Sequence, residues 1–223
     1  EISCSLVGSE MCIRDRIQAI QHNTGPCMVI AGPGSGKTTV LTHRVRYLIE
    51  RYGVNPSDIL VITFTKAAAE QMKLKFKGLS EGRNSAVTFG TFHAVFFTIL
   101  KAAYNYSAHC IIKPQIQHEF VKDQMCRLEL EYDDENEAVA GVLSEISCVK
   151  GEDVNIDEYE SRCIPPQSFR IMYRAYDDML VRKHLIDFDD MIVQCRELLM
   201  QREDYRRAWQ NKYKYCLLYT SPS

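Results

Sequence analysis

The chain has 223 residues, of which 46% are hydrophobic and 25% are charged, with a formal net charge of −2. This composition excludes a wholly disordered protein, and no apolar run approaches the ~18 residues that a membrane-spanning helix needs. Nine cysteines give an odd count without a C-x-x-C pair. We therefore expect neither a disulfide framework nor a zinc site, and we expect a cytoplasmic location. The start of the chain shows no signal-peptide pattern.

Charge is distributed unevenly along the chain. Residues 129–160 contain twelve acidic residues and one lysine, Lys150, whereas residues 37–101 contain ten Lys or Arg and four Asp or Glu. A basic segment is therefore joined to a strongly acidic one. This division permits a phosphate-contacting face, but two solvated surfaces of opposite sign explain it equally well.

Short apolar runs alternate with helical patterns in the first half of the chain. Cys27–Ala31, bounded by Gly-Pro pairs, predicts a buried strand, and Lys37–Tyr52 predicts a helix that ends at Gly53. The pattern continues with strands over Ile59–Phe64 and Ala86–Phe89, and with helices over Lys66–Lys77, capped by Thr65 and ended by Gly78, and Phe92–Ala103. Such alternation predicts a parallel sheet with right-handed crossovers.

The alternation stops near residue 104, and residues 104–165 predict acidic helical segments without a strand. We interpret them as a helical insertion. Beyond it, one core-facing helical stripe contains Phe169, Met172, Tyr173, Tyr176 and Leu180. Asp187 is placed to cap a last helix whose apolar face contains Phe188, Met191, Ile192, Cys195, Leu198 and Leu199.

A glycine-rich loop separates the first predicted strand from the first predicted helix. Its residues are Ala31, Gly32, Pro33, Gly34, Ser35, Gly36, Lys37 and Thr38. Glycines allow successive backbone N–H groups to surround an anion, and the helix N-terminus adds its positive dipole. Lys37 would contact the outer phosphates of a nucleoside triphosphate, and the Thr38 hydroxyl would bind Mg²⁺. The strict pattern has glycine where this chain has Ala31.

Four sequence blocks, in this order, resemble the UvrD/Rep-type superfamily 1 DNA helicases, over about residues 17–215. The blocks are the glycine-rich loop with Val40–Arg44, then Val61–Met72, Gly90–His93 and Leu185–Met191. The resemblance implies a P-loop NTPase whose RecA-like parallel sheet (domain 1A, here incomplete) carries an inserted helical subdomain (1B). It assigns residues 17–100 and 181–215 to domain 1A and residues 101–180 to 1B. The implied function is ATP-dependent translocation on single-stranded DNA and unwinding at duplex junctions, with ATP and Mg²⁺.

The resemblance also implies which residues contact single-stranded DNA. Thr63, Phe64, Thr65 and Lys66 would lie along the strand of DNA, as would Thr91, Phe92 and His93. An aromatic ring there can stack on a base, and a lysine can contact a phosphate. Simpler readings remain for some of these residues, because Phe64 could end a buried strand and His93 could be structural. We expect Lys73, Lys75 and Lys77 to be solvated, and Asp187, Asp189 and Asp190 to serve capping and packing.

The chain departs from the family pattern in several places. Arg16 stands where the family has the glutamine that reads adenine, and Thr39 stands where members often have arginine. The segment 216–223 replaces the family's apolar strand and its Asp-Glu pair, so we expect the chain to lack that motif and the second RecA-like domain. We expect residues 1–16 and 216–223 to be non-native flanks of a longer protein.

Three alternatives stay open. The chain could be a nucleotide- or DNA-binding remnant without turnover, or part of an AddA/RecB-type helicase–nuclease. It could also be a different P-loop enzyme such as a kinase, although the blocks around Phe64 and His93 argue against that. ATP turnover that ignores single-stranded DNA would favour this last reading.

Overall fold

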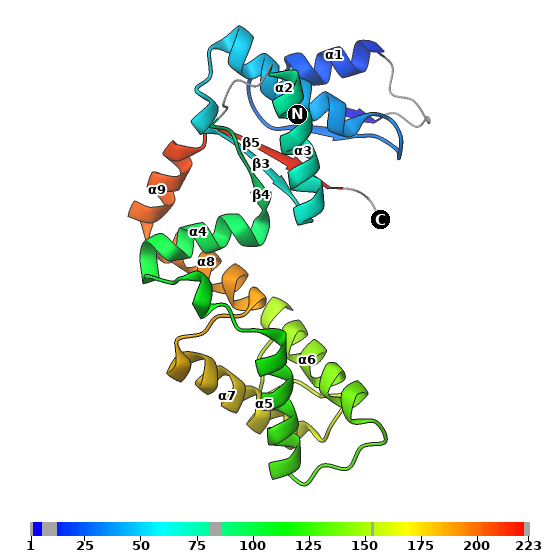
Figure 1. Cartoon of the computed structure of the whole chain (residues 1–223), viewed down its shortest axis with the longest axis vertical. Coiled ribbons are helices and arrows are strands. Elements are labelled where there is room, and N and C mark those ends of the chain that lie inside the picture. The colour runs from blue at the N-terminus through cyan, green and yellow to red at the C-terminus, as the bar shows by residue number, and fades with distance from the viewer. Residues whose placement is uncertain (1, 6–12, 81–85, 153, 221–223) are drawn as a thin grey trace. The chain divides into compact units, whose positions relative to one another are not determined.

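The computed structural model describes residues 2–5, 13–80, 86–152 and 154–220 (Figure 1). The chain divides into two compact units, Glu1–Ala94 together with Asp204–Ser223, and Val95–Glu203. The first unit contains parallel sheets flanked by helices, and the second is built from helices. The predicted α/β class with a parallel sheet is therefore confirmed. Parts of the predicted flanks (residues 1, 6–12 and 221–223) lie outside the described residues.

The main sheet has the strand order β4-β3-β5, and both pairings are parallel. Its strands are β3 (Ile59–Thr63), β4 (Thr88–Thr91) and β5 (Tyr215–Tyr219). Every residue of the central strand β3 is buried, as its uninterrupted apolar sequence predicts. The fourth strand begins and ends two residues later than the predicted Ala86–Phe89, so Gly90 and Thr91 belong to the strand.

Helices α2 (Lys37–Tyr52) and α3 (Lys66–Leu79) pack with this sheet. One core cluster joins them to β3, with Val45, Leu48, Ile59, Val61, Met72, Phe76 and Val87 buried together. Both ends of α2 agree with the prediction, and Gly53 ends the helix in the left-handed conformation. Helix α3 runs past the predicted end at Gly78 to Leu79, followed by Ser80 at its C-terminus. Lys73, Lys75 and Lys77 are exposed as expected.

The prediction of a buried strand over Cys27–Ala31 is wrong in its burial. Strand β2 (Cys27–Ile30) is exposed along its length and pairs in parallel with β1 (Ile2–Ser5) rather than with the main sheet. A cavity of about 760 Å³ is lined by residues of both β2 and β5. The apolar sequence of this strand therefore borders open space instead of a packed neighbour.

The second unit has a core cluster of its own, formed by α5 (Pro114–Arg127), α6 (Glu135–Glu152) and α7 (Pro166–Lys183), and it also contains α8 (Phe188–Gln201). The predicted stripe of α7 is confirmed, because Phe169, Met172, Tyr176 and Leu180 are buried and Tyr173 packs against them. The apolar face of α8 is confirmed only in part. Met191, Cys195 and Leu198 are buried, whereas Phe188 and Ile192 are exposed.

Further helices are α1 (Ile13–Gln21), which packs with α2 in the first unit, and α4 (Phe92–Tyr104) and α9 (Glu203–Lys212), which span the boundaries between the two units in the sequence. Short 3₁₀ turns lie at Pro56–Asp58 and Ala108–Cys110. The chain enters and leaves the α5–α7 region side by side, because Ile111 and Ile186 form a parallel bridge. The Ile186 N–H donates to the Cys110 carbonyl at 2.8 Å, and the Ile112 N–H donates to the Ile186 carbonyl at 3.0 Å.

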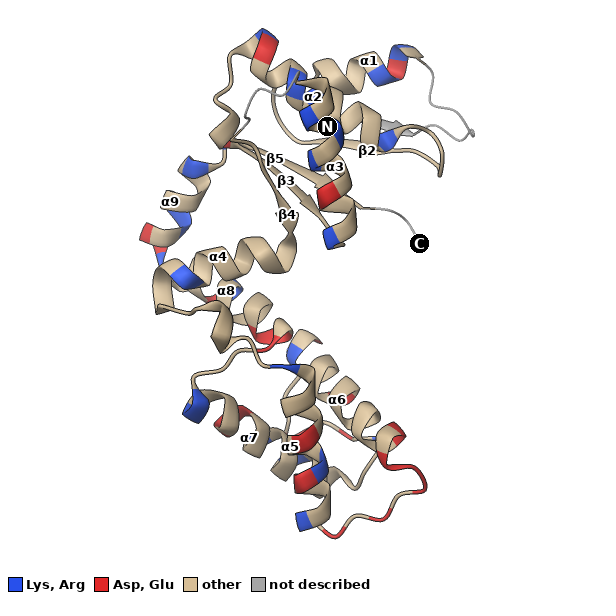
Figure 2. Cartoon of the chain, in the orientation of Figure 1, with Lys and Arg blue, Asp and Glu red and all other residues tan. Residues whose placement is uncertain are grey.

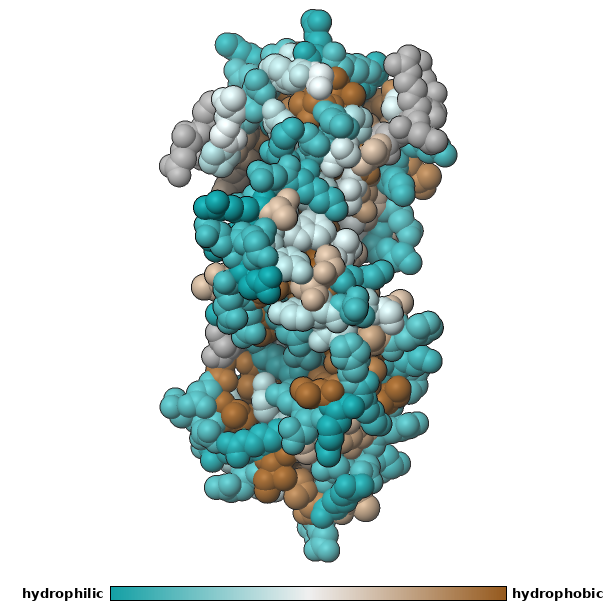
Figure 3. Space-filling view, turned by 90° about the vertical axis from the view of Figure 1, so that its left-hand side faces the viewer, coloured by the Kyte–Doolittle hydropathy of each residue, from teal (hydrophilic) through white to brown (hydrophobic). Residues whose placement is uncertain are grey.

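The surface of the helical unit is mixed in character. Figure 2 shows acidic residues, in red, gathered on the loop between α5 and α6, where the sequence is most acidic. Figure 3 shows apolar patches among polar side chains, and Ile171 and Val181 are among the exposed apolar residues of this unit. None of the helices in the described part of the chain combines the length and apolar character that crossing a membrane requires.

Candidate functional site

The glycine-rich loop lies between β2 and α2, as predicted. Gly34 and Gly36 have φ angles of +77° and +85°, which side chains with a Cβ adopt only at a cost. Gly36 is the residue before the first turn of α2, a helix of 16 residues. The sequence therefore folds into a tight loop that leads directly into a helix N-terminus, where unpaired N–H groups and the helix dipole favour an anion.

The Lys37 ammonium is held within this loop. Its Nζ atom donates to the carbonyls of Ala31 and Gly32, both at 2.9 Å. The Ser35 hydroxyl donates to the Gly32 carbonyl at 2.7 Å, which closes the turn from inside, and Ser35 is buried. A phosphate group bound in the loop would offer the half-buried ammonium a charged partner in place of two neutral carbonyls.

Thr38 is the second residue of α2 and is half-buried at the same helix N-terminus. Its hydroxyl is the only magnesium ligand that the sequence assigns to this loop. The described residues contain no group of three or more His, Cys, Asp or Glu side chains that could hold a metal ion.

Two arginines lie where the upstream helix α1 approaches the loop and α2. Arg16 lies beside the loop, since its Cζ atom is 3.8 Å from the point where a Cβ on Gly36 would stand. Arg44 of α2 donates from Nη1 to the carbonyls of Ala19, at 3.0 Å, and of Ile20 and His22, near the C-terminus of α1. Burial lowers the pKa of Arg44. Sequence reasoning did not assign a role to Arg44, although a cation on the apolar face of α2 was a usable signal.

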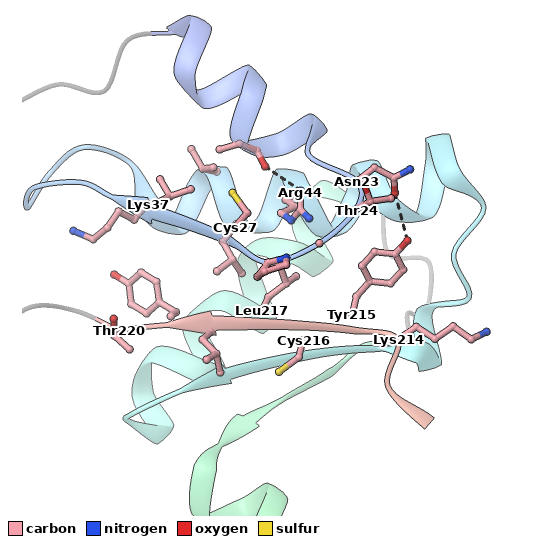
Figure 4. Close-up of a pocket in the computed structure, with 18 residues that line it drawn as sticks. Asn23, Thr24, Cys27, Lys37, Arg44, Lys214, Tyr215, Cys216, Leu217 and Thr220 are labelled. Atoms are coloured by element: carbon pink, nitrogen blue, oxygen red, sulfur yellow. Dashed lines mark hydrogen bonds between the residues drawn. The ribbon is translucent and has the colours of Figure 1, made fainter. Parts of the chain in front are cut away.

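Figure 4 shows the cavity that begins at Lys37 and continues between β2 and β5. Arg44 and Cys27 lie on its upper side in this view, and Leu217 lies on the β5 side. The Tyr215 hydroxyl reaches Asn23 Oδ1 at 3.5 Å, across the end of the cavity opposite Lys37. The predicted loop residues are thus brought together at one end of an open space.

The second group of predicted residues lies at the carboxyl ends of β3 and β4. These strands are neighbours in register, with Thr63 opposite Thr91. Each strand leads directly into a helix, and each of these helices has a threonine hydroxyl at its start. Thr65 Oγ1 accepts from the Ala68 N–H at 3.2 Å in α3, and Thr91 Oγ1 accepts from the Ala94 N–H at 3.3 Å in α4.

Two phenylalanines meet at this edge. The ring centroids of Phe64 and Phe92 are 5.5 Å apart, and Phe64 is 67% exposed, so it does not end its strand inside the core. Lys66 is also exposed, and its Nζ atom lies 3.9 Å from Glu70 Oε1. An exposed ion pair of this kind contributes little to stability. His93 is half-buried in the first turn of α4.

Thr63 differs from the other residues of this group because its side chain is fully buried. Its hydroxyl donates to the Thr65 carbonyl at 2.8 Å and so fixes the turn that presents Phe64. The structure therefore brings six of the seven predicted contact residues to an accessible edge and turns Thr63 inward.

Comparison of the sequence with known proteins identifies a matching family and several related proteins. A sequence model of the UvrD/REP helicase N-terminal domain matches residues 14–218. The chain is 33% identical to the ATP-dependent DNA helicase Rep of Escherichia coli (strain K12) over 209 residues, which cover 90% of this chain and 30% of that protein. It is 31% identical to the putative ATP-dependent DNA helicase YjcD of Bacillus subtilis (strain 168), in a match that covers 92% of this chain and 27% of that protein.

A third relative is the ATP-dependent DNA helicase PcrA of Staphylococcus epidermidis, at 29% identity over 213 residues. The match covers 90% of this chain and 28% of PcrA. The chain thus spans about three tenths of the length of the relatives that it matches.

Proposed function

Because this chain belongs to the UvrD/REP helicase N-terminal domain family, we propose that it is the ATP-binding part of an ATP-dependent DNA helicase. In the intact protein, ATP hydrolysis would drive movement along single-stranded DNA and the opening of duplex junctions. The relatives named as ATP-dependent DNA helicases support this assignment. Free thiols at all cysteines whose side chains are described fit a cytoplasmic setting.

The nucleotide would bind with its phosphates in the loop 31–38. The backbone N–H groups and the start of α2 would surround the β-phosphate, and Lys37 would leave the Ala31 and Gly32 carbonyls to contact the outer phosphates. Thr38 would supply one ligand to Mg²⁺, whose charge offsets that of the phosphates.

Single-stranded DNA would lie across the carboxyl ends of β3 and β4. Phe64 offers an exposed ring for base stacking, with Phe92 supporting it, and Lys66 offers a cation for a phosphate. Thr65, Thr91 and His93 would contact the sugar-phosphate backbone near the two helix N-termini. Thr63 would act through the turn that it holds.

The observation that carries this proposal is the arrangement at the carboxyl ends of β3 and β4, where the helices α3 and α4 begin side by side. Two neighbouring parallel strands end in register, and both continue into helices that point positive N-termini toward the same edge. Ligands of open α/β sheets bind outside the carboxyl ends of the strands. We further propose that residues 101–180 form the 1B insertion, and the bridge between Ile111 and Ile186 supports this by bringing the two ends of that region together.

A fluorescence-anisotropy titration with a labelled oligo-dT strand tests the DNA assignment. Phe64→Ala should weaken binding by roughly tenfold, because stacking on one base is worth about 1–3 kcal/mol. Leu74→Ala is the matched control, since Leu74 is another large exposed apolar residue on the neighbouring helix α3. Equal affinities for the wild type and Phe64→Ala, or an equal loss in Leu74→Ala, would remove Phe64 from the interface.

A further inference from the structure

A partly buried cluster of charges lies in the helical unit, apart from the residues assigned to nucleotide and DNA, and its most exposed member is the Asp177 carboxylate, at 41%. The Lys150 ammonium on α6 contacts three carboxylates: Asp177 Oδ1 at 3.0 Å, Asp187 Oδ2 at 3.0 Å and Asp190 Oδ1 at 2.8 Å. The Lys150 and Asp187 side chains are each only 4% exposed. Asp177 belongs to α7, whereas Asp187 and Asp190 form the start of α8. One ammonium therefore joins three helices.

Neutral groups extend the cluster to a fourth helix. The Tyr176 hydroxyl of α7 donates to Asp187 Oδ2 at 3.2 Å, and Gln117 of α5 donates to that hydroxyl at 2.6 Å. Asp187 Oδ1 accepts from the Asp190 N–H at 2.7 Å and so caps α8, as predicted. The first turn of α8 is thus fixed by the same carboxylate that faces Lys150.

The cluster has more negative than positive charge, because three carboxylates share one ammonium. Burial and the neighbouring Asp187 raise the pKa of Asp190 to about 6, against the opposing effect of Lys150. Burial alone would lower the pKa of Lys150, but Asp187, Asp190 and Asp177 outweigh it and raise that pKa. Lys150 therefore stays charged, and Asp190 is the group at which a proton relieves the repulsion between carboxylates.

We propose that this cluster is a proton-linked latch, which holds the first turn of α8 against α6 and α7 most tightly when it carries one extra proton. A carboxyl group that binds its proton more tightly in the folded state adds stability as pH falls, and this contribution is lost as pH rises through about 6. The latch operates whether or not the chain binds nucleotide or DNA, so the inference is independent of the proposed function.

Other titratable groups near Asp190 must be separated from it. Tyr173 and Tyr176 have pKa values raised mainly by burial, and they stay neutral in this range. His184 lines the same cavity of about 440 Å³ as Asp190 and stacks on Tyr106 with ring centroids 5.0 Å apart. Among the described residues, the charged and titratable groups that surround Asp190 are the other cluster members, Lys150, Asp177 and Asp187, together with Tyr106, Tyr173, Tyr176 and His184.

Hydrogen exchange of the full chain tests the latch, read by mass spectrometry at the amides of residues 187–192. In the wild type, the opening constant of these amides, corrected for intrinsic exchange, should fall about tenfold from pH 7.5 to pH 5.0. Asp190→Asn mimics the protonated carboxyl and keeps an acceptor oxygen for Lys150. The Asp190→Asn variant should show no fall of the opening constant with pH. At pH 7.5 its amides should already be as protected as those of the wild type at pH 5.0.

His184→Asn is the control, because asparagine tolerates the left-handed conformation that His184 adopts at the end of α7. This variant should keep the tenfold pH response of the wild type. The proposal is overturned if Asp190→Asn responds to pH as the wild type does, or if His184→Asn removes the response.

Discussion

Lys150 is the single lysine in the acidic stretch 129–160, yet its side chain is buried. The sequence contained a signal for this burial, because Val139, Val142, Ile146 and Val149 form the buried face of α6, and Lys150 follows Ile146 by four residues. The surrounding acidic composition hides that signal, since a lysine among twelve acidic residues reads as a solvated ion-pair partner. Whether a charged residue of a helix is buried is therefore predicted better from the helix face on which it lies than from the charges of its neighbours in the sequence.

Replacing Lys150 by methionine should destabilise the helical unit by about 3–5 kcal/mol at pH 7, because the change leaves a buried carboxylate without its counter-ion. Urea unfolding followed by circular dichroism measures this loss. Arg174→Met is the matched control, since Arg174 pairs with Asp157 at an exposed position of the same unit, and it should cost less than about 1 kcal/mol. Equal losses in the two variants would show that the cluster contributes no more than a surface ion pair.

Most residues of the two candidate sites can be picked out from the sequence as candidates. The loop 31–38 can be recognised in the sequence from its glycines and Lys37. The positive φ angles of Gly34 and Gly36 are ones that glycine adopts readily. The pairing of Phe64 with Phe92 could not be read from the sequence, because it depends on the register that sets Thr63 opposite Thr91. The inward orientation of the Thr63 side chain was likewise hidden, since a threonine at the end of a buried strand can face either side of the sheet.

Helix termini are the elements that the sequence predicted best. Thr65 and Asp187 cap α3 and α8 through the hydrogen bonds expected of these residue types. Strand β2 is where element-level reasoning failed, since four apolar residues indicate a buried strand only if a neighbouring strand covers them. In this structure β2 pairs with β1 and borders a cavity on the side of β5.

The cap at the start of α3 has a measurable energetic role. Thr65→Ala removes the acceptor for the Ala68 N–H and should lower the free energy of unfolding by about 0.5–2 kcal/mol. Thermal unfolding monitored by circular dichroism detects the change. Thr39→Ala provides the comparison, because Thr39 is exposed inside α2, where alanine is the better helix former. A Thr65→Ala protein as stable as Thr39→Ala would contradict the capping role.

Two hydrophobic core clusters are found in the described part of the chain, one in each compact unit. One surrounds β3 with α2 and α3, and the other lies among α5, α6 and α7, and the two clusters share no residue. In the sequence, the alternation of strands and helices gives way to helices near residue 104. The compact helical unit, Val95–Glu203, is wider than the predicted insertion 101–180 and includes α8. Its extent depends on packing between helices distant in sequence, which periodicity does not report.

Separate cores imply separate responses to mutation. Leu48 is fully buried in the core of the sheet unit, so Leu48→Ala should cost about 2–5 kcal/mol through lost burial and an incompletely filled cavity. Hydrogen exchange should show faster exchange in β3 and α2, with unchanged protection in α5 and α7. Equal loss of protection in both units would show that they unfold as one.

Phosphate binding at the loop 31–38 is the central claim at the scale of the whole molecule, because the ATP-dependent activity proposed for the protein depends on it. Calorimetric titration of the full chain with ATP and Mg²⁺ tests this claim most directly. We expect saturable binding that Lys37→Ala weakens at least about tenfold, since a hydrogen bond between charged groups is worth about 1.5–3 kcal/mol. Lys75→Ala, which alters an exposed lysine on α3, should bind as the wild type does. Absence of binding by the wild type, or equal binding by Lys37→Ala, would contradict the account.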